Sequence, residues 1–393
     1  MPSMAKINAF SKKAKYTAVS FFSGMGGASI GMKMAGFKVV YANEFVPVAA
    51  DAYEANSNIK VDREDVRKVD AKRVYKLSGI KPGELDLLEG SPPCKAFSST
   101  QARKQGKDFG NEVDYSEGIK QRVDDLFFEF CRILKQMQPK VFIAENVPGL
   151  VKAINRGYFV EIHKALTDCG YLVQAVVVDP SRLGVPQKRE RLILQGVRND
   201  LVKAGFMPAW CKPSKYETTV QECLPHIERI KSTRGYIHAR TPSPTITASD
   251  HSIGETANFS CGGYCEDDKG KTRKYTIDEL KVLSSVPADF VFPRQEKETD
   301  KKHFQRSWER LGRIHVPLQV YHITKAIREQ IIEPFYLNKG KPYATQQPKP
   351  VADKPSSADS IKVRSAHRPE ALRKSTRSDG SGSEKQRQPR RAR

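Results

Sequence analysis

The chain has 393 residues, of which 38% are hydrophobic, so it can form one large domain or two ordinary ones around a real core. Average Gly and Pro usage, scattered cysteines, and the absence of a secretory signal or a long apolar run argue against fibrous, secreted and membrane-spanning proteins. The formal net charge of +22 favours a polyanionic partner such as nucleic acid.

A strand, a glycine-rich turn, a short helix and a second strand are predicted at the start of the chain. Residues 17–22 form an apolar run that stops at the turn 23–27, and residues 39–42 form the second run. Glycines in such a turn let the backbone approach a ligand closely. Glu44 ends the second strand, where an acid can hold ribose hydroxyls, although a solvated glutamate after an ordinary turn fits the same pattern.

Strands and amphipathic helices continue to alternate for some 200 residues. The predicted elements are strands over 84–89, 141–144, 172–178 and 191–196, and helices over 124–137 and 158–169. This alternation is typical of a doubly wound α/β sheet, in which ligands bind outside the carboxyl ends of the strands. The residues that follow each strand are therefore the candidates for a site.

Reactive side chains follow three of these strands. Cys94 comes after two prolines on a loop, where a thiolate can act as a nucleophile, although a small apolar residue packed under a turn is the alternative. Glu145 follows the strand 141–144 and can act as an acid or hydrogen-bond partner. Arg189 and Arg191 are spaced to lie on one face at the start of the strand 191–196.

Together these motifs resemble the cytosine-C5 DNA methyltransferases of the prokaryotic or phage type. The resemblance covers about residues 16–335 and rests on the order and spacing of the motifs. They read Phe22-Ser23-Gly24-Met25-Gly26-Gly27, Glu44, Pro92-Pro93-Cys94-Lys95-Ala96-Phe97-Ser98, Glu145-Asn146-Val147 and Gln187-x-Arg189-x-Arg191.

The resemblance implies a Rossmann-like catalytic domain that transfers a methyl group from S-adenosylmethionine to C5 of cytosine. In that family the thiolate, here Cys94, attacks C6 while the glutamate, here Glu145, holds the amino group and protonated N3. Arg191 would hold the base O2, and Arg189 would support the catalytic loop together with Gln187. No metal is implied.

The resemblance also assigns a cofactor-binding set around the glycine turn. Phe22 and Phe45 would stack on adenine, Glu44 would bind the ribose, and Asp65 would accept from the adenine amino group unless it only caps a helix. The whole expected set is Phe22, Ser23, Gly24, Gly26, Gly27, Glu44, Phe45, Asp65, Val66 and Pro93.

Cytosine in a duplex hides C5 and C6, so the base must be flipped out. Residues 99–118 are polar and resemble the mobile loop that closes over flipped substrate in this family. The last motif departs from the family pattern, because the usual Gly-Asn before Val-Pro reads Gly312-Arg313-Ile314-His315 here. That departure makes cofactor affinity less certain than the other motifs suggest.

The expected organisation has five parts. They are an N-terminal extension (1–15), a catalytic S-adenosylmethionine-binding domain (16–197), a small target-recognition domain (198–310), a C-terminal helix returning to the catalytic domain (311–337) and a disordered basic tail (338–393). The tail carries 15 basic and 5 acidic residues. Expected DNA contacts in the recognition domain, unless they form only a solvated basic surface, are His226, Arg229, Lys231, Arg234 and Tyr236. A zinc site on Cys211, Cys223, Cys261 and Cys265 is not expected, because their spacing fits no standard pair of zinc knuckles.

The expected partner is double-stranded DNA, with a cognate restriction endonuclease as an open further partner. The resemblance implies a monomeric cytoplasmic enzyme, nucleoid-associated in a bacterium or encoded by a phage. Two alternatives stay open: a transfer-RNA cytosine-C5 methyltransferase of the same fold, and a catalytically silent DNA-binding relative. The Cys-Phe-Thr tripeptide that marks the transfer-RNA branch is absent from this sequence, which argues against the first alternative. The presence of Cys94, Glu145 and Arg191 argues against the second.

Overall fold

The computed structural model describes residues 1–93, 112–115, 119–122, 125–151, 156–232, 235–250 and 263–337, the segments 112–115 and 119–122 by their backbone. The chain divides into two units, and every described residue belongs to the first, Met1–Thr345. Cys94 and the basic tail 338–393 lie outside the described residues.

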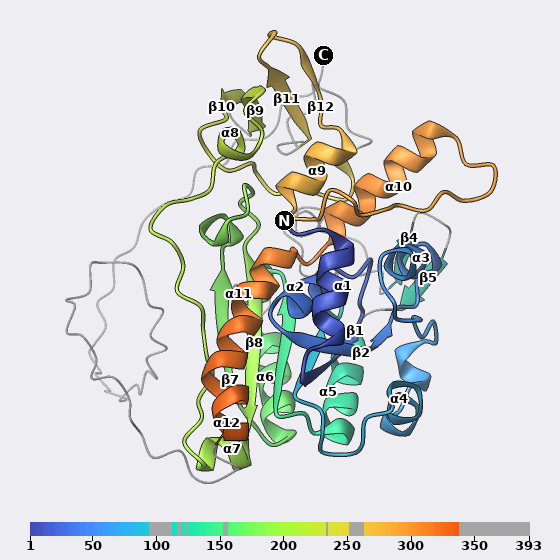
Figure 1. The fold of residues 1–393 in the computed structure, drawn as a ribbon, viewed down its shortest axis with the longest axis vertical. Helices are drawn as coiled ribbons and strands as arrows, with labels where there is room; N and C mark the ends of the chain where they lie inside the picture. Colours follow the sequence, from blue (N-terminus) through green and yellow to red (C-terminus); the bar gives the residue numbers. More distant parts are fainter. Residues whose placement is uncertain are drawn as a thin grey trace, which may run out of the picture. The chain divides into compact units, whose positions relative to one another are not determined.

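A six-stranded sheet in the order β2-β1-β3-β6-β8-β7 forms the larger part of this unit (Figure 1). Its strands are β1 (Tyr16–Phe21), β2 (Phe37–Asn43), β3 (Leu87–Gly90), β6 (Val141–Asn146), β7 (Tyr171–Val178) and β8 (Arg191–Arg198). The strands β2, β1, β3 and β6 pair in parallel, whereas β8 runs antiparallel to both of its neighbours. The expected doubly wound α/β sheet is confirmed, with one strand reversed.

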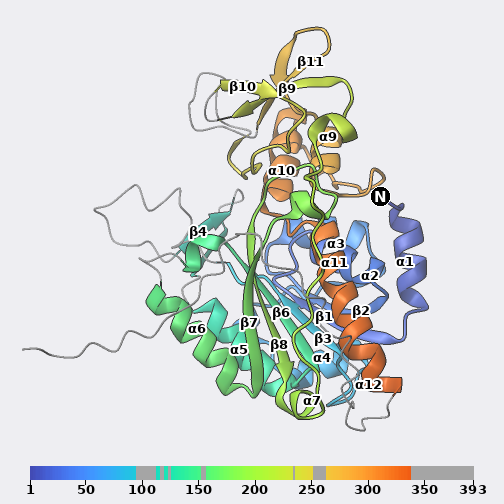
Figure 2. The ribbon, with the colours of Figure 1, turned by 90° about the vertical axis from the view of Figure 1, so that its left-hand side faces the viewer.

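Helices cover both faces of this sheet (Figure 2). In β6, Phe142 and Ala144 pack with one helix layer while Val141 and Ile143 pack with the other, as the two-residue period of a strand requires. One layer contains α4 (Ala71–Ser78), α5 (Leu126–Met137) and α6 (Arg156–Asp168). The other contains α2 (Gly27–Met34) and α11 (Pro317–Ile327), which continues through a π-helical turn (Arg328–Ile332) into α12 (Glu333–Leu337).

The first residues of the chain form helix α1 (Met4–Lys12), which packs against α2. The sequence identified residues 1–15 only as an N-terminal extension and predicted no helix there. The helix begins where the Ser3 side chain accepts from the Lys6 N–H, and it buries Met4 and Ile7. The Met4 backbone N–H also donates to both carboxylate oxygens of Asp289, at 3.0 and 2.9 Å, which ties the start of the chain to its C-terminal third.

A smaller sheet, in the order β10-β9-β11-β12, follows the large one along the chain. Its strands are β9 (Ile227–Ser232), β10 (Gly235–His238), β11 (Tyr264–Asp267) and β12 (Thr272–Lys274). Its apolar side chains share one cluster with α8 (Val220–Cys223), α9 (Ile277–Leu283) and α10 (Asp300–Arg313). Before this sheet begins, α7 (Asn199–Lys203) and the residues Phe206 and Ala209 still pack with the α2–α11 layer of the large sheet.

Short elements complete the described part of the chain. They are α3 (Pro47–Ala55), the 3₁₀ turns η1 (Val66–Lys68), η3 (Pro148–Val151) and η5 (Pro180–Leu183), and an antiparallel ribbon of β4 (Glu112–Tyr115) and β5 (Ile119–Arg122). The ribbon differs from the expected loop over 99–118, because Val113 and Tyr115 alternate with acidic residues at the period of a strand. The rest of that stretch lies outside the described residues. None of the described helices is long and apolar enough to cross a membrane.

The carboxylate of Glu279 holds the small sheet to the start of α9. It accepts from Arg273 Nη2 and the Thr276 backbone N–H, each at 2.7 Å, and lies 2.7 Å from His226 Nε2. The side chain is only 8% exposed. Burial alone would raise the pKa of Glu279, but the bonds from Arg273 and His226 outweigh burial and lower the pKa to about 2.

We expect Glu279→Gln to lower the free energy of unfolding at pH 7 by on the order of 2 kcal/mol. A carboxyl whose pKa is lower in the folded than in the unfolded state stabilises fully above its unfolded value of 4.5, and the gain is lost as the pH falls toward about 2. Urea unfolding at a series of pH values should therefore show the deficit shrinking below pH 4.5. The control is Asp278→Asn, on the same helix but 88% exposed. A deficit that stays constant down to pH 3 would assign the effect to packing and not to charge.

Candidate active site

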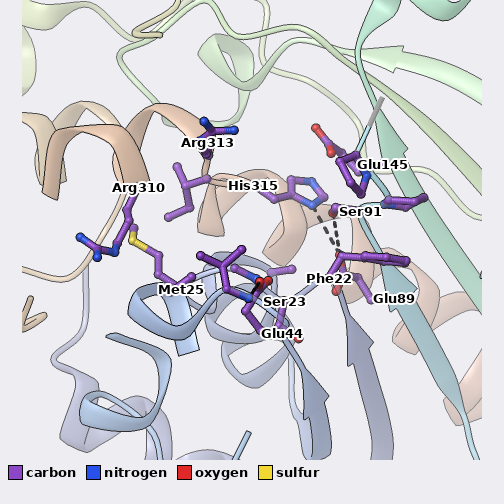
Figure 3. Close-up of a pocket in the computed structure, with 18 of the residues that line it drawn as sticks. Phe22, Ser23, Met25, Glu44, Glu89, Ser91, Glu145, Arg310, Arg313 and His315 are labelled. Atoms are coloured by element: carbon purple, nitrogen blue, oxygen red, sulfur yellow. Dashed lines mark hydrogen bonds and ion pairs between the residues drawn. The ribbon is translucent and has the colours of Figure 1, made fainter. Parts of the chain in front are cut away.

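A cavity of about 490 Å³ lies at the carboxyl ends of the parallel strands (Figure 3). This is the edge at which ligands bind in open α/β sheets, and β1 is flanked there by β2 and β3, where the strand order reverses. Eleven of the residues expected from sequence line the cavity: Phe22, Ser23, Gly24, Gly27, Glu44, Phe45, Val66, Pro93, Glu145, Arg189 and Arg191. Gly26 and Asp65 are not among its lining residues.

The turn after β1 has an unusual backbone. Phe22 has a φ of 54°, in the left-handed region that residues other than glycine rarely adopt. Gly26 begins α2 with a φ of 95°, and a Cβ there would overlap the Tyr53 ring. A Cβ at Gly27 would overlap the His315 carbonyl oxygen, so the turn and the segment before α11 are in direct backbone contact. Strain of this kind is concentrated at functional turns.

Glu44 is buried in the cavity wall and bonded to the turn. Its Oε2 accepts from the Gly24 backbone N–H and its Oε1 from the Val46 N–H, each at 2.7 Å. Burial raises the pKa of Glu44 above its ordinary value, against the opposing effect of these two bonds. Each oxygen keeps a further lone pair, so the carboxylate can still accept from a ligand hydroxyl.

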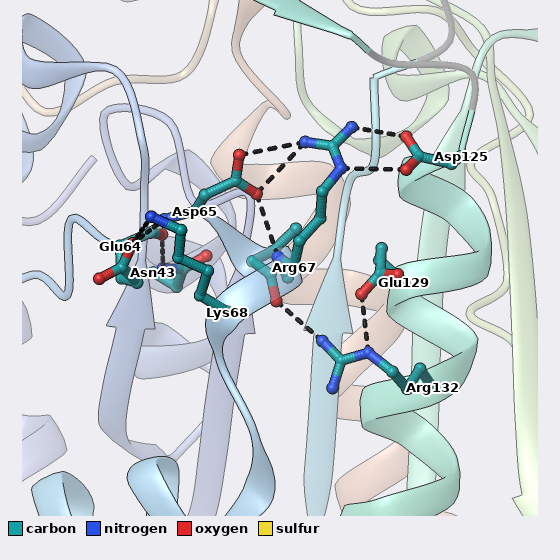
Figure 4. Close-up of polar contacts among 9 residues, drawn as sticks. Asn43, Glu64, Asp65, Arg67, Lys68, Asp125, Glu129 and Arg132 are labelled. Carbon is teal, nitrogen blue, oxygen red and sulfur yellow. Dashed lines mark hydrogen bonds and ion pairs between the residues drawn. The ribbon is translucent and has the colours of Figure 1, made fainter.

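Asp65 and Val66 occupy different environments, although they are neighbours. Val66 lines the cavity, whereas the Asp65 side chain caps η1 by accepting from the Arg67 backbone N–H at 3.0 Å. Arg67 bridges Asp65 and Asp125, at 3.1 and 2.5 Å (Figure 4). Asp65 is therefore observed as the cap of η1. The Arg67 bridge ties the loop after β2 to the start of α5.

Glu145 and Arg191 form a partly buried ion pair in the cavity wall. Arg191 Nε lies 2.7 Å from Glu145 Oε1, and the two side chains are 13% and 15% exposed. Glu145 is the second-last residue of β6, and Arg191 is the first residue of β8. Because β8 is antiparallel, its first residue reaches the same edge as the carboxyl ends of the other strands. The reversal of β8 is what places the arginine beside the glutamate.

Arg189 has a different environment from Arg191. It is 2% exposed, and its guanidinium donates to the backbone carbonyls of Ile246 at 2.9 Å and Gly312 at 2.8 Å. Gln187 is buried as well, and it bonds the Leu283 carbonyl and the Ile246 N–H. These two side chains hold the segment around Ile246 and the end of α10 against the approach to β8.

Several cavity residues were not found by sequence reasoning. Glu89 lies inside β3, and its acidic side chain in an otherwise apolar strand was the available signal. Arg310 and Arg313 lie one turn apart in α10, and Arg313 and His315 both belong to the altered last motif. The lining residues that received no role from the sequence include Met25, Asn43, Glu89, Ser91, Glu309, Arg310, Arg313, Ile314 and His315.

The expected nucleic-acid contacts lie on the small sheet. Arg229 and Lys231, both on β9, lie over the Tyr236 ring of β10, at 5.9 and 5.3 Å from its centroid. His226 pairs with Glu279 instead, and Arg234 lies outside the described residues. Two basic side chains around one aromatic ring form a surface suited to phosphate and sugar contacts.

The four cysteines considered as zinc ligands do not form a ligand cluster in the described part of the chain. Cys211 packs beside the α2–α11 layer, whereas Cys265 is buried in the cluster of the small sheet. Cys261 lies outside the described residues. Among the residues that the structure describes, no group of three or more His, Cys, Asp or Glu side chains is placed to hold a metal ion.

Comparison with known proteins gives consistent results. The family model for C-5 cytosine-specific DNA methylases matches residues 16–233. The Type II methyltransferase M.FnuDI of Fusobacterium nucleatum is 34% identical over 48% of this chain and 48% of its own length. The Type II methyltransferase M.HindV of Haemophilus influenzae is 30% identical over 70% of this chain and 86% of its own length.

The chain spans about half the length of several curated relatives that it matches, among them M.FnuDI at 48%. The fold is also similar to the crystal structure of the Dnmt2 methyltransferase of S. pombe, with a TM-score of 0.57 and 15% identity, over 82% of this chain and 99% of that one. The family match covers more than half of the chain and includes the β1 turn, Glu145 and Arg191. The chain therefore belongs to the C-5 cytosine-specific DNA methylase family.

Proposed function

We propose that the protein is a sequence-specific DNA (cytosine-5)-methyltransferase that uses S-adenosylmethionine. The observation that carries the proposal is the Glu145–Arg191 pair, which meets the cavity beside Pro92 and Pro93, the residues that lead to Cys94. By sequence, Cys94 follows β3, so a nucleophile would join the acid of β6 and the cation of β8. This set matches what cytosine needs for attack at C6.

The residues of the cavity fit S-adenosylmethionine. The cavity volume of about 490 Å³ suits a cofactor-sized ligand. Phe22, Phe45 and Val66 give apolar surface for a purine, and Glu44 offers carboxylate oxygens to a ribose. Bound there, the cofactor would supply the methyl group. Asp65 caps η1 and is paired with Arg67, so it is proposed to act only by placing Val66 in the cavity wall.

In the proposed mechanism, Cys94 and Glu145 act together on a cytosine that has been flipped out of the duplex. The Cys94 thiolate forms a bond to C6, and the electron pair of the 5,6 double bond shifts as N3 takes up a proton that Glu145 holds. Arg191 keeps the Glu145 carboxylate oriented and faces the base oxygen O2. Once C5 carries the methyl group, a base takes the C5 proton. The electron pair of that C–H bond restores the 5,6 double bond as the C6–S bond breaks and releases the Cys94 thiolate.

Arg189 is proposed as a positioning residue, because its donors bond backbone carbonyls. By holding Ile246 and Gly312, it keeps the segment that precedes α11 against the active-site edge. The surface of Arg229, Lys231 and Tyr236 is proposed to contact DNA. The partner is accordingly double-stranded DNA, and a companion restriction endonuclease is proposed from the Type II names of the relatives.

Bisulfite sequencing of DNA from cells that express the protein tests this proposal. We expect protection of cytosine at one short sequence, in every copy of it, and no protection in cells that express Cys94→Ala. Protection scattered without sequence preference would contradict the sequence-specific part of the proposal. Unprotected DNA from cells with abundant folded protein would contradict the activity.

Deleting residues 338–393 should weaken DNA binding without changing the target sequence. The segment carries 15 basic and 5 acidic residues and no Phe or Trp, so it can neutralise phosphates but offers little for reading bases. Fluorescence anisotropy at several salt concentrations should show a shallower dependence of log affinity on log salt for the truncated protein. Equal slopes for the two proteins would mean that the tail does not contact DNA.

A further inference from the structure

A buried polar group in the floor of the cavity is not explained by the motifs of the family. It consists of Glu89, in β3, and His315, in the segment between α10 and α11. Their side chains are 2% and 5% exposed, and both residues line the cavity, close to Ser91 (Figure 3). An acid and an imidazole buried at one ligand-binding wall need partners, because desolvation of unpaired polar groups is costly.

The Glu89 carboxylate is fixed in place by serine hydroxyls. Ser20 donates to its Oε2 at 2.6 Å and Ser91 to its Oε1 at 3.0 Å, while Ser23 of the glycine turn donates to Ser20 at 2.9 Å. The register puts Ser20 of β1 beside Glu89 of β3. The carboxylate is therefore oriented by β1 and β3 while each oxygen keeps capacity for another donor.

Unlike the Glu89 carboxylate, the imidazole of His315 has no hydrogen bond among the described residues. Neither of its ring nitrogens has a hydrogen-bond partner among the described residues, and Nδ1 lies 3.8 Å from Glu89 Oε1, beyond hydrogen-bond distance. The backbone around it is held, because buried Arg189 bonds the Gly312 carbonyl at 2.8 Å and Gly27 lies against the His315 carbonyl. The ring is thus a buried donor, held rigidly in a cavity wall, with no partner for its nitrogens.

We infer that Glu89 and His315 bind the amino-acid end of S-adenosylmethionine, with Glu89 accepting from the α-ammonium group and His315 donating to the α-carboxylate. The inference rests on the proposed function. An acceptor and a donor side by side match an ammonium and a carboxylate on one carbon atom. The positively charged sulfonium centre offers the imidazole N–H no acceptor, so it would leave His315 unpaired. His315 lies in the altered last motif, where the usual asparagine is missing.

Comparing ligands that differ only at this end tests the assignment without relying on turnover. Binding of S-adenosylhomocysteine, S-adenosylmethionine and methylthioadenosine, which lacks the amino-acid end, is measured on the full chain by calorimetry or by competition. We expect Glu89→Gln and His315→Ala each to weaken both amino-acid ligands by about tenfold or more, the cost of a lost bond to a charged group. Methylthioadenosine should bind each variant within about twofold of wild type.

The controls separate a binding role from a structural one. His315→Leu, which has no donor, is the second variant should His315→Ala fail to fold, and His238→Asn, an exposed histidine on β10, should leave all three affinities unchanged. An equal loss for all three ligands would overturn the assignment in favour of a structural role. A loss confined to S-adenosylmethionine would assign Glu89 to the sulfonium and also overturn it, as would no loss at all. Failure of the wild-type protein to bind any of the three would instead contradict the proposed function.

Discussion

Replacing Glu145 with glutamine is expected to slow methyl transfer to cytosine by about two orders of magnitude or more, the usual range for a positioned acid. Glutamine is nearly isosteric and can still accept from Arg191, whose Nε lies 2.7 Å from the Glu145 carboxylate. It cannot deliver a proton to N3, however, and it replaces a charge-assisted bond with a weaker one. The deficit should therefore appear in the chemical step.

Single-turnover methylation of a duplex by an excess of enzyme measures that step. Binding to a duplex in which the target base is missing should survive the substitution, because that complex needs no contact with cytosine. Glu161→Gln, on the exposed side of α6, is the matched control and should react at the wild-type rate. A Glu145→Gln protein with an unaltered single-turnover rate would show that another carboxylate contacts the base.

Cys94→Ala is expected to abolish turnover while cofactor and DNA binding remain, because the thiol acts only in the covalent step. Wild-type protein should form a denaturation-resistant adduct with DNA that carries 5-fluorocytosine at the target, since C5 then has no proton to lose. Gel electrophoresis after denaturation detects this adduct, and Cys94→Ala should not form it. Cys223→Ala, a half-buried cysteine of α8, should behave as wild type. Methyl transfer by Cys94→Ala at more than a few per cent of the wild-type rate would contradict the mechanism.

The sequence predicted the large sheet well because its signals are local. The β1 run, the glycine turn and the apolar strand β6 each end where a turn residue or a charged residue interrupts the pattern. The reversal of β8 is not readable in this way, since the direction of a strand depends on how the chain returns from β7. The helix α10 was also missed, although Thr299 caps it, because its polar residues outnumber the apolar ones that pack on the small sheet.

The candidate site was predicted in the same uneven way. Residues within a motif, such as Glu44, Glu145 and Arg191, could be identified from neighbouring sequence, and they line one cavity. The sequence offered a signal for Glu89 and His315, an acid in an apolar strand and an altered motif. It could not show that the two lie together, because their contact joins residues far apart in the chain. Asp65 shows a further limit, since the same Asp-Val sequence suits a ligand contact and the cap of a short turn, and only the position of Arg67 distinguishes them.

The most direct test of the account is to identify the product. The purified chain is incubated with S-adenosylmethionine labelled in its methyl group, together with duplex DNA or with transfer RNA, and the nucleosides are then separated by chromatography and mass spectrometry. The account predicts label in 5-methyldeoxycytidine from DNA and none above background from transfer RNA. Label in 5-methylcytidine from transfer RNA, or DNA that stays unlabelled beside an active control enzyme, would contradict it.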